Sequence, residues 1–255
     1  EIKYRLLIAT TDNLGRNARK TLQAQEKPIG IVLRGNLVQA ELVWPDKVGP
    51  RPKKLPRKKP RPHQAKAIRD VVKGFQDHRR GQLIMACGTG KTLTSLWINE
   101  RLKSRRMLVL VPSLSLVSQT LHEWSRNCKQ PFESLVVCSD ETVVKKGGDE
   151  ATPSTVDLGI PVTTDPDEIR TFLRRRSKHP TVVFCTYQSS DRIAIAQESR
   201  VPKFDLVLAD EAHRCAGGAA GLFGTVLDDQ RIKAERRLFL TATPRYFSKQ
   251  ARQQA

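Results

Sequence analysis

Between residues 64 and 241, short apolar segments alternate with segments whose apolar residues recur at helical spacing. This alternation constrains the fold more than any other feature of the chain, because strands that are apolar throughout must be covered on both faces. The sequence therefore predicts an α/β fold with a doubly wound, parallel sheet, which binds ligands beyond the carboxyl ends of its strands. The expected strands are 82–86, 107–111, 134–138, 181–186, 205–209 and 237–241, and the expected helices are 64–78, 91–103, 114–126, 166–177 and 188–198.

A proline-rich, basic segment, RPKKLPRKKPRP at 51–62, precedes this region. The 255 residues carry 45 Lys and Arg against 26 Asp and Glu, a formal net charge of +19, and seven of the basic residues fall in this segment. Proline at this density disfavours helices and sheet ladders, so residues 45–62 are predicted to be a linker. The linker is either a solvated spacer or a basic strap along a phosphate backbone. The overall charge points to a polyanionic partner, most simply nucleic acid.

Residues 1–44 contain apolar strands at 4–10 and 29–33 around a helix at 13–25. A piece of this size cannot form an independent core, so we expect it to be the tail of a preceding domain. The chain begins inside a strand without an initiator Met, which favours a fragment of a longer protein. Residues 63–255 are expected to form one complete domain, interrupted by a flexible surface insertion at 139–165.

The cysteine pattern narrows the class of protein. Five cysteines, none at C-x-x-C spacing, argue against a zinc site or a disulfide framework and fit a reducing cytoplasm. No apolar run approaches the roughly 18 residues that a membrane span requires, and no signal-peptide pattern is present. We therefore expect a cytoplasmic protein without a membrane partner.

The segment Ala86-Cys-Gly-Thr-Gly-Lys-Thr92 follows an apolar strand and opens a helix, the setting that a phosphate-binding loop requires. Gly88 and Gly90 allow tight turns that direct backbone N–H groups at phosphate oxygens, and the helix adds its positive dipole end. Lys91 is expected to reach the β- and γ-phosphates, and the Thr92 hydroxyl to coordinate Mg²⁺. The residues predicted to bind the nucleotide here are Cys87, Gly88, Thr89, Gly90, Lys91, Thr92 and Leu93.

A second apolar strand ends in two adjacent carboxylates, Asp210 and Glu211, followed by His213. Asp210 suits coordination of Mg²⁺ together with Thr92, and Glu211 suits a base that orients the attacking water. A further strand ends in Thr241-Ala-Thr243, whose hydroxyls are expected to bond His213 and Glu211 and to relay the state of the nucleotide to another surface. The predicted catalytic residues are Lys91, Asp210, Glu211 and His213.

In this order and at these separations, the motifs resemble those of superfamily 2 helicases and translocases. The resemblance covers residues 61–247. MACGTGKT at 85–92 is similar to motif I, with Met85 in place of the usual Ala, DEAH at 210–213 to motif II, and TAT at 241–243 to motif III. The resemblance implies a RecA-like P-loop NTPase lobe that binds ATP and Mg²⁺.

Three shorter segments extend the resemblance. RPHQ at 61–64 is similar to the family's adenine-recognition motif, which assigns Arg61 and Gln64 to the nucleotide, since a Gln amide can pair with adenine through one donor and one acceptor. Segments 111–119 and 186–188 look like motifs Ia and Ib, which lie along the nucleic-acid strand in the family. The nucleic-acid residues that they imply are Pro112, Ser113, Ser115, Gln119, Thr186, Tyr187 and Gln188.

MACGTGKT, ADEAHR and LTATPR look more like the motors of type I, III and ISP restriction enzymes than like DEAD-box RNA helicases. Residues 1–44 also resemble the closing strand–helix–strand of an Mrr-like nuclease domain. The resemblance implies double-stranded DNA, a second RecA-like domain and nuclease or methyltransferase modules as partners. Only 12 residues follow Thr243, so we expect the second lobe to be absent and the fragment to hydrolyse little ATP.

Other functions remain open at this stage. A DEAH-type RNA helicase lobe would be distinguished by stimulation of ATPase activity by RNA rather than by duplex DNA. A non-catalytic, nucleotide-dependent DNA-binding module would be favoured if the complete protein lacked the arginine motifs of a second lobe. A P-loop kinase is disfavoured, because the DEAH and TAT segments would then have no role.

Overall fold

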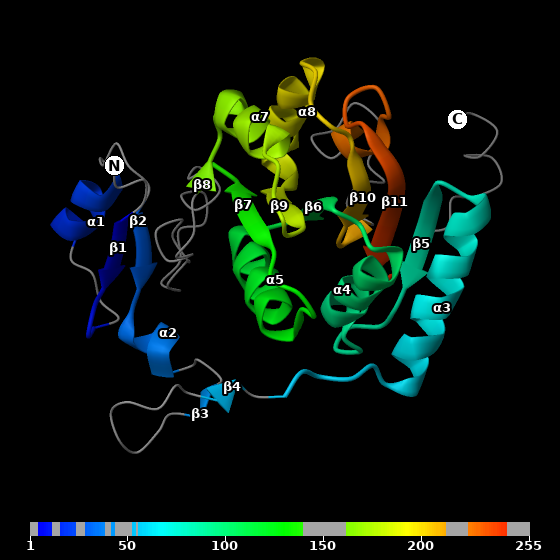
Figure 1. Cartoon of the computed structure of the whole chain (residues 1–255), viewed down its shortest axis with the longest axis horizontal. Coiled ribbons are helices and arrows are strands. Elements are labelled where there is room, and N and C mark those ends of the chain that lie inside the picture. The colour runs from blue at the N-terminus through cyan, green and yellow to red at the C-terminus, as the bar shows by residue number, and fades with distance from the viewer. Residues whose placement is uncertain are drawn as a thin grey trace. The chain divides into compact units, whose positions relative to one another are not determined.

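The computed structural model describes residues 5–11, 16–23, 29–38, 42–43, 53–54, 56–139, 162–212 and 224–243 (Figure 1). The chain divides into two compact units. The smaller comprises residues 1–59 and 140–162, and the larger comprises residues 60–139 and 163–255. Each unit is described by itself.

The larger unit is built on a seven-stranded sheet with the order β5-β11-β10-β6-β9-β7-β8. Neighbouring strands from β5 to β7 pair in parallel. This arrangement confirms the α/β class with a parallel sheet that the sequence predicts. The strands are β5 (Arg80–Ile84), β6 (Arg106–Val111), β7 (Glu133–Val137), β8 (Val162–Thr163), β9 (Thr181–Thr186), β10 (Phe204–Ala209) and β11 (Ala234–Thr241).

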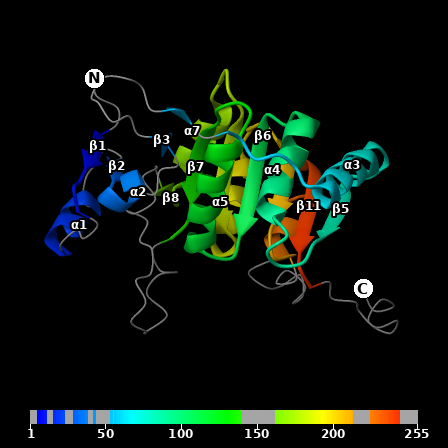
Figure 2. The same cartoon turned by 90° about the horizontal axis from the view of Figure 1, so that it is seen from below.

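Helices cover both faces of this sheet. Figures 1 and 2 show α3 (Pro62–Asp77), α4 (Lys91–Leu102) and α5 (Leu114–Asn127) on one face. The other face carries α7 (Pro166–Arg174) and α8 (Ser190–Glu198). Two 3₁₀ turns, η2 (Tyr187–Ser189) and η4 (Gly224–Leu227), complete the described elements. The doubly wound arrangement explains why β9 is buried along its whole length, as continuous apolar strands require.

Element boundaries differ from the sequence-based expectations by a few residues. The helix expected at 64–78 begins earlier, at Pro62, because proline fits the first turn of a helix, where its missing N–H is not needed. The helix expected at 166–177 ends at Arg174. Most of the insertion expected at 139–165 lies outside the described residues.

The smaller unit contains β1 (Arg5–Ile8), α1 (Arg16–Gln23), β2 (Ile29–Val32) and α2 (Arg34–Val38), with β1 and β2 paired in parallel. It also contains a short antiparallel ladder between β3 (Leu42–Val43) and β4 (Lys53–Lys54). This ladder corrects the expectation that the basic segment joins no sheet. Lys53 and Lys54 lie in a stretch between two prolines. Because neither residue is itself a proline, both keep the backbone N–H that a ladder needs.

Some negative findings concern the described residues alone. Their helices include none that is long and apolar enough to cross a membrane. Across the same ranges, no group of three or more His, Cys, Asp or Glu side chains is arranged to hold a metal ion. Cys87 is exposed, whereas Cys138 and Cys185 are buried, and burial raises the pKa of the Cys185 thiol well above its ordinary value.

A buried arginine anchors β11 to the loop that precedes it. The side chain of Arg237 is 4% exposed, pairs with Asp229, and donates to the carbonyl oxygens of Val226 (3.0 Å) and Ile232. Burial lowers the pKa of Arg237, and the carboxylate of Asp229 opposes that shift. The guanidinium therefore satisfies the backbone of the loop that leads from η4 into β11.

Replacing Arg237 by Ala should lower the free energy of unfolding by about 3 kcal/mol, because it leaves two buried carbonyls without their donor. Urea unfolding followed by circular dichroism measures this change. Arg231→Ala is the matched control, since Arg231 forms an exposed pair with Asp191 and should cost less than about 1 kcal/mol. Equal losses in the two variants would contradict the anchoring role of Arg237.

Candidate functional site

The carboxyl ends of five adjacent strands bring the predicted motifs together. In the order β5, β11, β10, β6, β9, these ends lead into the segments 85–92, 241–243, 210–211, 112–113 and 186–188. Segments that are more than 100 residues apart in the chain thus follow neighbouring strands at one edge of the sheet (Figure 1). This edge is where an open parallel sheet binds its ligands.

The glycine-rich loop has the backbone that its sequence predicts. Gly88 and Gly90 have φ angles of 75° and 86°, in the region that favours glycine, and α4 begins directly after Gly90. The hydroxyl of Thr89 donates to the carbonyl of Ala86 at 2.6 Å, which closes the turn. Cys87 is exposed, whereas Leu93 is buried, so its side chain belongs to the core and only its backbone can serve the loop.

Gln64 fastens the start of α3 to this loop. Its Oε1 accepts a hydrogen bond from the backbone N–H of Arg61 at 2.8 Å, and its Nε2 donates to the carbonyl of Thr89 at 3.0 Å. His63 approaches the same carbonyl, with Nε2 at 3.4 Å from the oxygen. The side chain of Gln64 is buried and Arg61 is exposed. Nε2 of Gln64 also donates to the carbonyl of Gly90 at 3.5 Å, so both contacts of this nitrogen hold the loop, and a lone pair of Oε1 remains for the expected pairing with adenine.

Lys91 and Glu211 meet across the site. The Lys91 side chain is only 10% exposed, and its Nζ lies 3.4 Å from the carbonyl oxygen of Met85 and 3.9 Å from Oε1 of Glu211. Glu211 has a φ angle of 51°, unusual for a residue with a side chain, and its backbone N–H donates to Oδ1 of Asp210 at 2.9 Å. Such backbone strain in a sharp turn persists when the surroundings impose it, and it often marks functional sites.

Two buried aromatic residues donate hydrogen bonds to the backbone of the site. Tyr187 is fully buried and donates from its hydroxyl to the carbonyl of Asp210 at 2.7 Å. Trp124, also fully buried, donates from Nε1 to the carbonyl of Thr92 at 2.9 Å. Sequence analysis missed Trp124, because an apolar position at helical spacing indicates core packing and nothing more. Both residues position the expected metal ligands through their backbones.

Some residues of the two segments expected to lie along nucleic acid are exposed, and others are buried. Ser115, Gln119 and Gln188 are exposed, and Ser113 caps α5 by accepting a hydrogen bond from the N–H of Leu116 at 3.4 Å. Three other residues of this expectation, Pro112, Thr186 and Tyr187, are buried. The side chains of Thr186 and Tyr187 are buried because strand β9 is covered on both faces and the turn that follows it packs inward, so the nucleic-acid role of these residues stays a prediction.

The TAT segment contacts the glycine-rich loop directly. The carbonyl of Thr241 accepts a hydrogen bond from the N–H of Met85 at 3.1 Å. The Thr241 hydroxyl is buried and bonds the backbone N–H and carbonyl of Thr243 at 3.2 Å each. His213, which is expected to bond the hydroxyls of this segment, lies outside the described residues.

The donor set fits a nucleotide and its metal ion. A helix N-terminus, two glycines at positive φ and the ammonium of Lys91 converge at the loop, and these groups favour phosphate. The hydroxyl of Thr92 and the carboxylate of Asp210 are hard oxygen ligands of the kind Mg²⁺ prefers.

The chain is similar to several known proteins. Residues 57–246 match the family described as type III restriction enzyme, res subunit. The solved structure of the ATP-dependent type ISP restriction-modification enzyme LlaBIII bound to DNA superposes with a TM-score of 0.81 and 32% identity, over 94% of this chain and 16% of that one. The structure of a nuclease-deletion mutant of the type ISP enzyme LlaGI in complex with a DNA substrate mimic superposes with a TM-score of 0.61 and 35% identity. The match covers 74% of this chain and 18% of that one.

A protein of African swine fever virus described as a "probable helicase" is 37% identical over 177 residues, which cover 68% of this chain and 18% of the viral protein. The chain therefore spans less than a fifth of the length of each of these three proteins.

Gly90→Ala should abolish nucleotide binding, because an added Cβ would lie 2.5 Å from Nε2 of Gln64 at a φ angle that L-residues rarely adopt. Gly74→Ala is the matched control: nothing lies within 4 Å of its Cβ position in α3, and the change should stabilise the fold by about 0.5–1 kcal/mol. Binding is measured with a fluorescent ATP analogue, and stability by thermal unfolding. Unchanged nucleotide affinity in Gly90→Ala would reject the fit of the loop.

Proposed function

This chain belongs to the type III restriction enzyme res-subunit family, and on that basis we propose that it is the first RecA-like lobe of an ATP-dependent DNA translocase. The complete enzyme belongs to a restriction-modification or phage-defence system that acts on duplex DNA. The observation that carries the proposal is the meeting of Lys91 and Glu211, 3.9 Å apart, at the edge of the sheet where five motif segments gather.

The chain's own residues divide the work of hydrolysis. Lys91 offsets the negative charge of the β- and γ-phosphates, and the N–H groups at the start of α4 hold the phosphate oxygens. Thr92 and Asp210 hold the metal ion, which when bound supplies further positive charge to the phosphate oxygens. Glu211 orients the attacking water and accepts its proton. The bond between Thr241 and Met85 provides a path from this loop to the end of β11.

Duplex DNA is the favoured partner for two reasons. Both type ISP neighbours are described in complex with DNA or a DNA substrate mimic. Ser113, Ser115, Gln119 and Gln188 lie at the edge that also carries the nucleotide loop, and hydroxyl, amide and helix N–H groups bind backbone phosphate without reading sequence. We extend the proposal to a second RecA-like lobe and to nuclease and methyltransferase modules, as the resemblance to type ISP enzymes implies.

The proposal also assigns residues 1–44 to the end of a nuclease domain. The match to LlaBIII covers 94% of the chain, whereas the match to the nuclease-deletion mutant of LlaGI covers 74%. The difference is close to the share of the chain that precedes α3. The parallel β1–β2 pair with α1 between the strands is consistent with this assignment.

Lys91→Ala and Glu211→Gln should each abolish ATPase activity and translocation in the full-length protein. Lys91→Ala removes the cation at the phosphates, and Glu211→Gln keeps the shape of the side chain but loses the base. Phosphate release and triplex displacement measure the two activities. Lys66→Ala, at an exposed ion pair on α3, is the control and should behave as wild type. DNA-stimulated ATPase at the wild-type rate in either site variant would reject the assigned roles.

Duplex DNA should stimulate the ATPase of the full-length protein at least tenfold more than RNA of the same sequence and length. The expectation follows from the DNA complexes of the two type ISP neighbours. Steady-state ATPase rates with duplex DNA, single-stranded DNA and RNA test it. Stimulation by RNA alone would favour the RNA helicase alternative. No stimulation by any nucleic acid, with nucleotide binding intact, would favour a non-catalytic DNA-binding module.

A further inference from the structure

The amino-terminal edge of the sheet, opposite to the nucleotide loop, carries a dense group of cations. Three loops enter the neighbouring strands β6, β9 and β7 there, at residues 103–105, 175–180 and 128–132. Six exposed basic side chains on these loops form what we call the three-loop patch: Lys103, Arg105, Lys129, Arg175, Arg176 and Lys178.

Hydrogen bonds hold the three loops to one another. The guanidinium of Arg105 donates to the carbonyl of Ser177 at 2.8 Å, and the N–H of Thr181 donates to the carbonyl of Arg105 at 2.7 Å. The N–H of Glu133 donates to the carbonyl of Pro180 at 2.9 Å, and Ser177 Oγ donates to Oε1 of Glu133 at 2.7 Å. The patch is therefore a preorganised surface, which lowers the entropy cost of binding a ligand.

The carboxylates within the patch are already engaged. Oε1 of Glu100 accepts the backbone N–H of Lys129 at 2.6 Å, and Glu133 accepts Ser177 and lies 3.7 Å from Arg175. A third carboxylate, that of Asp205, accepts the backbone N–H groups of Arg105 and Arg106 at 2.6 and 2.9 Å. Six basic residues against these three acids leave a net charge of +3. Lys103, Arg176 and Lys178 form no ion pair within the described ranges. These cations are thus available to an external anion.

A cavity of about 330 Å³ opens within the patch. Lys103, Arg105 and Lys129 are among the residues that line it, together with Phe132 and Trp124. Three of the six cations of the patch therefore border one hollow, where they can face the same bound group.

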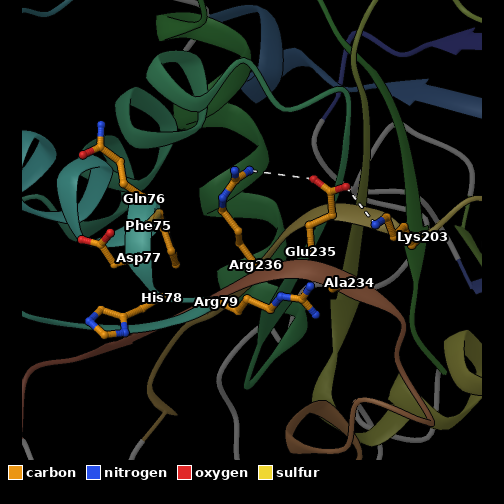
Figure 3. Close-up of a pocket in the computed structure, with 9 residues that line it drawn as sticks. All are labelled: Phe75, Gln76, Asp77, His78, Arg79, Lys203, Ala234, Glu235 and Arg236. Atoms are coloured by element: carbon orange, nitrogen blue, oxygen red, sulfur yellow. Dashed lines mark ion pairs between the residues drawn. The ribbon is translucent and has the colours of Figure 1, made fainter.

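A second depression at the same edge differs from the three-loop patch in its charge balance. It has a volume of about 340 Å³ and lies between the end of α3 and the starts of β5, β10 and β11 (Figure 3). There Glu235 lies 2.9 Å from Nζ of Lys203 and 3.9 Å from Arg236. The hydrogen bond from Lys203, with Arg236 and Arg79 nearby, lowers the pKa of Glu235. This depression neutralises much of its own charge, whereas the three-loop patch does not.

We propose that the three-loop patch binds the phosphate backbone of duplex DNA, on a stretch separate from the one held at the carboxyl edge. The proposal rests on the proposed function as a DNA motor. Neighbouring strands lie about 4.8 Å apart, so the three loops span about 10 Å, which matches roughly three phosphates along one DNA strand. The six residues of β6 separate the two edges by about 20 Å, so one straight segment cannot lie along both.

The test compares two triple variants of the full-length protein with equal loss of charge. Lys103→Gln/Arg176→Gln/Lys178→Gln removes the unengaged cations of the patch. Arg79→Gln/Lys203→Gln/Arg236→Gln is the control from the self-neutralised depression. Fluorescence anisotropy without nucleotide measures duplex affinity between about 50 and 200 mM salt. The patch variant should bind at least tenfold more weakly, with a salt slope lower by about two to three, and the control should change less than threefold.

Further measurements make the outcome specific. A variant that keeps the charges, Lys103→Arg/Arg176→Lys/Lys178→Arg, should bind as wild type, and all variants should show the wild-type melting temperature. A hydroxyl-radical footprint should lose protection over one part of its length in the patch variant and keep the rest.

Equal losses in the patch and control variants, or an unchanged footprint, would overturn the proposal. So would a patch variant that loses affinity for polyglutamate while it keeps its affinity for duplex DNA, because the surface would then suit an acidic protein segment. DNA-stimulated ATPase separates this result from failure of the proposed function. If that stimulation persists while the patch variant binds normally, only the three-loop patch is rejected. If wild-type protein shows neither stimulation nor DNA binding, the proposed function fails.

Discussion

Parallel pairing of the strands is the constraint on which the rest of this structure depends. Parallel strands place all their carboxyl ends at one edge, so five segments that are far apart in the chain become neighbours without any long-range recognition between them. Parallel pairing also requires a crossover between successive strands, and these crossovers supply α4 and α5 with their N-termini at the same edge. The anion-binding character of the site is in this sense a consequence of topology before it is a consequence of any side chain.

Hydrogen bonds then turn adjacent segments into one site. Met85 is tied to Thr241, Asp210 to Tyr187, Thr92 to Trp124 and Thr89 to Gln64. In each pair, a backbone group of one motif is held by a residue from another strand or helix. Displacement of the glycine-rich loop would therefore strain the end of β11 and the start of α3 together. Such a connected backbone network is a physical basis for coupling nucleotide state to neighbouring surfaces, since packed interiors transmit small shifts rather than absorb them.

The sequence predicted the sheet class and most of its elements because burial on both faces leaves a strong apolar signature. It also predicted the glycine loop, since only Gly88 and Gly90 offer the required backbone freedom. It did not predict which polar side chains the fold would bury. Tyr187 reads as a surface residue of a motif, yet its ring is fully buried and its hydroxyl supports Asp210. Arg237, the first residue of an expected strand, is buried and donates to the carbonyls of Val226 and Ile232. Neither arrangement has a local sequence signal.

The two edges of the sheet use charge in opposite ways. At the carboxyl edge, Lys91 has a carboxylate partner 3.9 Å away, so its charge is balanced until phosphate competes for it. At the amino edge, Lys103, Arg176 and Lys178 have no such carboxylate within the described residues. A balanced cation favours selective, exchangeable binding, because a ligand must displace an existing contact. An unbalanced group favours binding that is strong at low salt and insensitive to ligand shape, because its gain comes from released counterions. The first suits a site that turns over a nucleotide, and the second suits a surface that keeps hold of a long polyanion while the first site works.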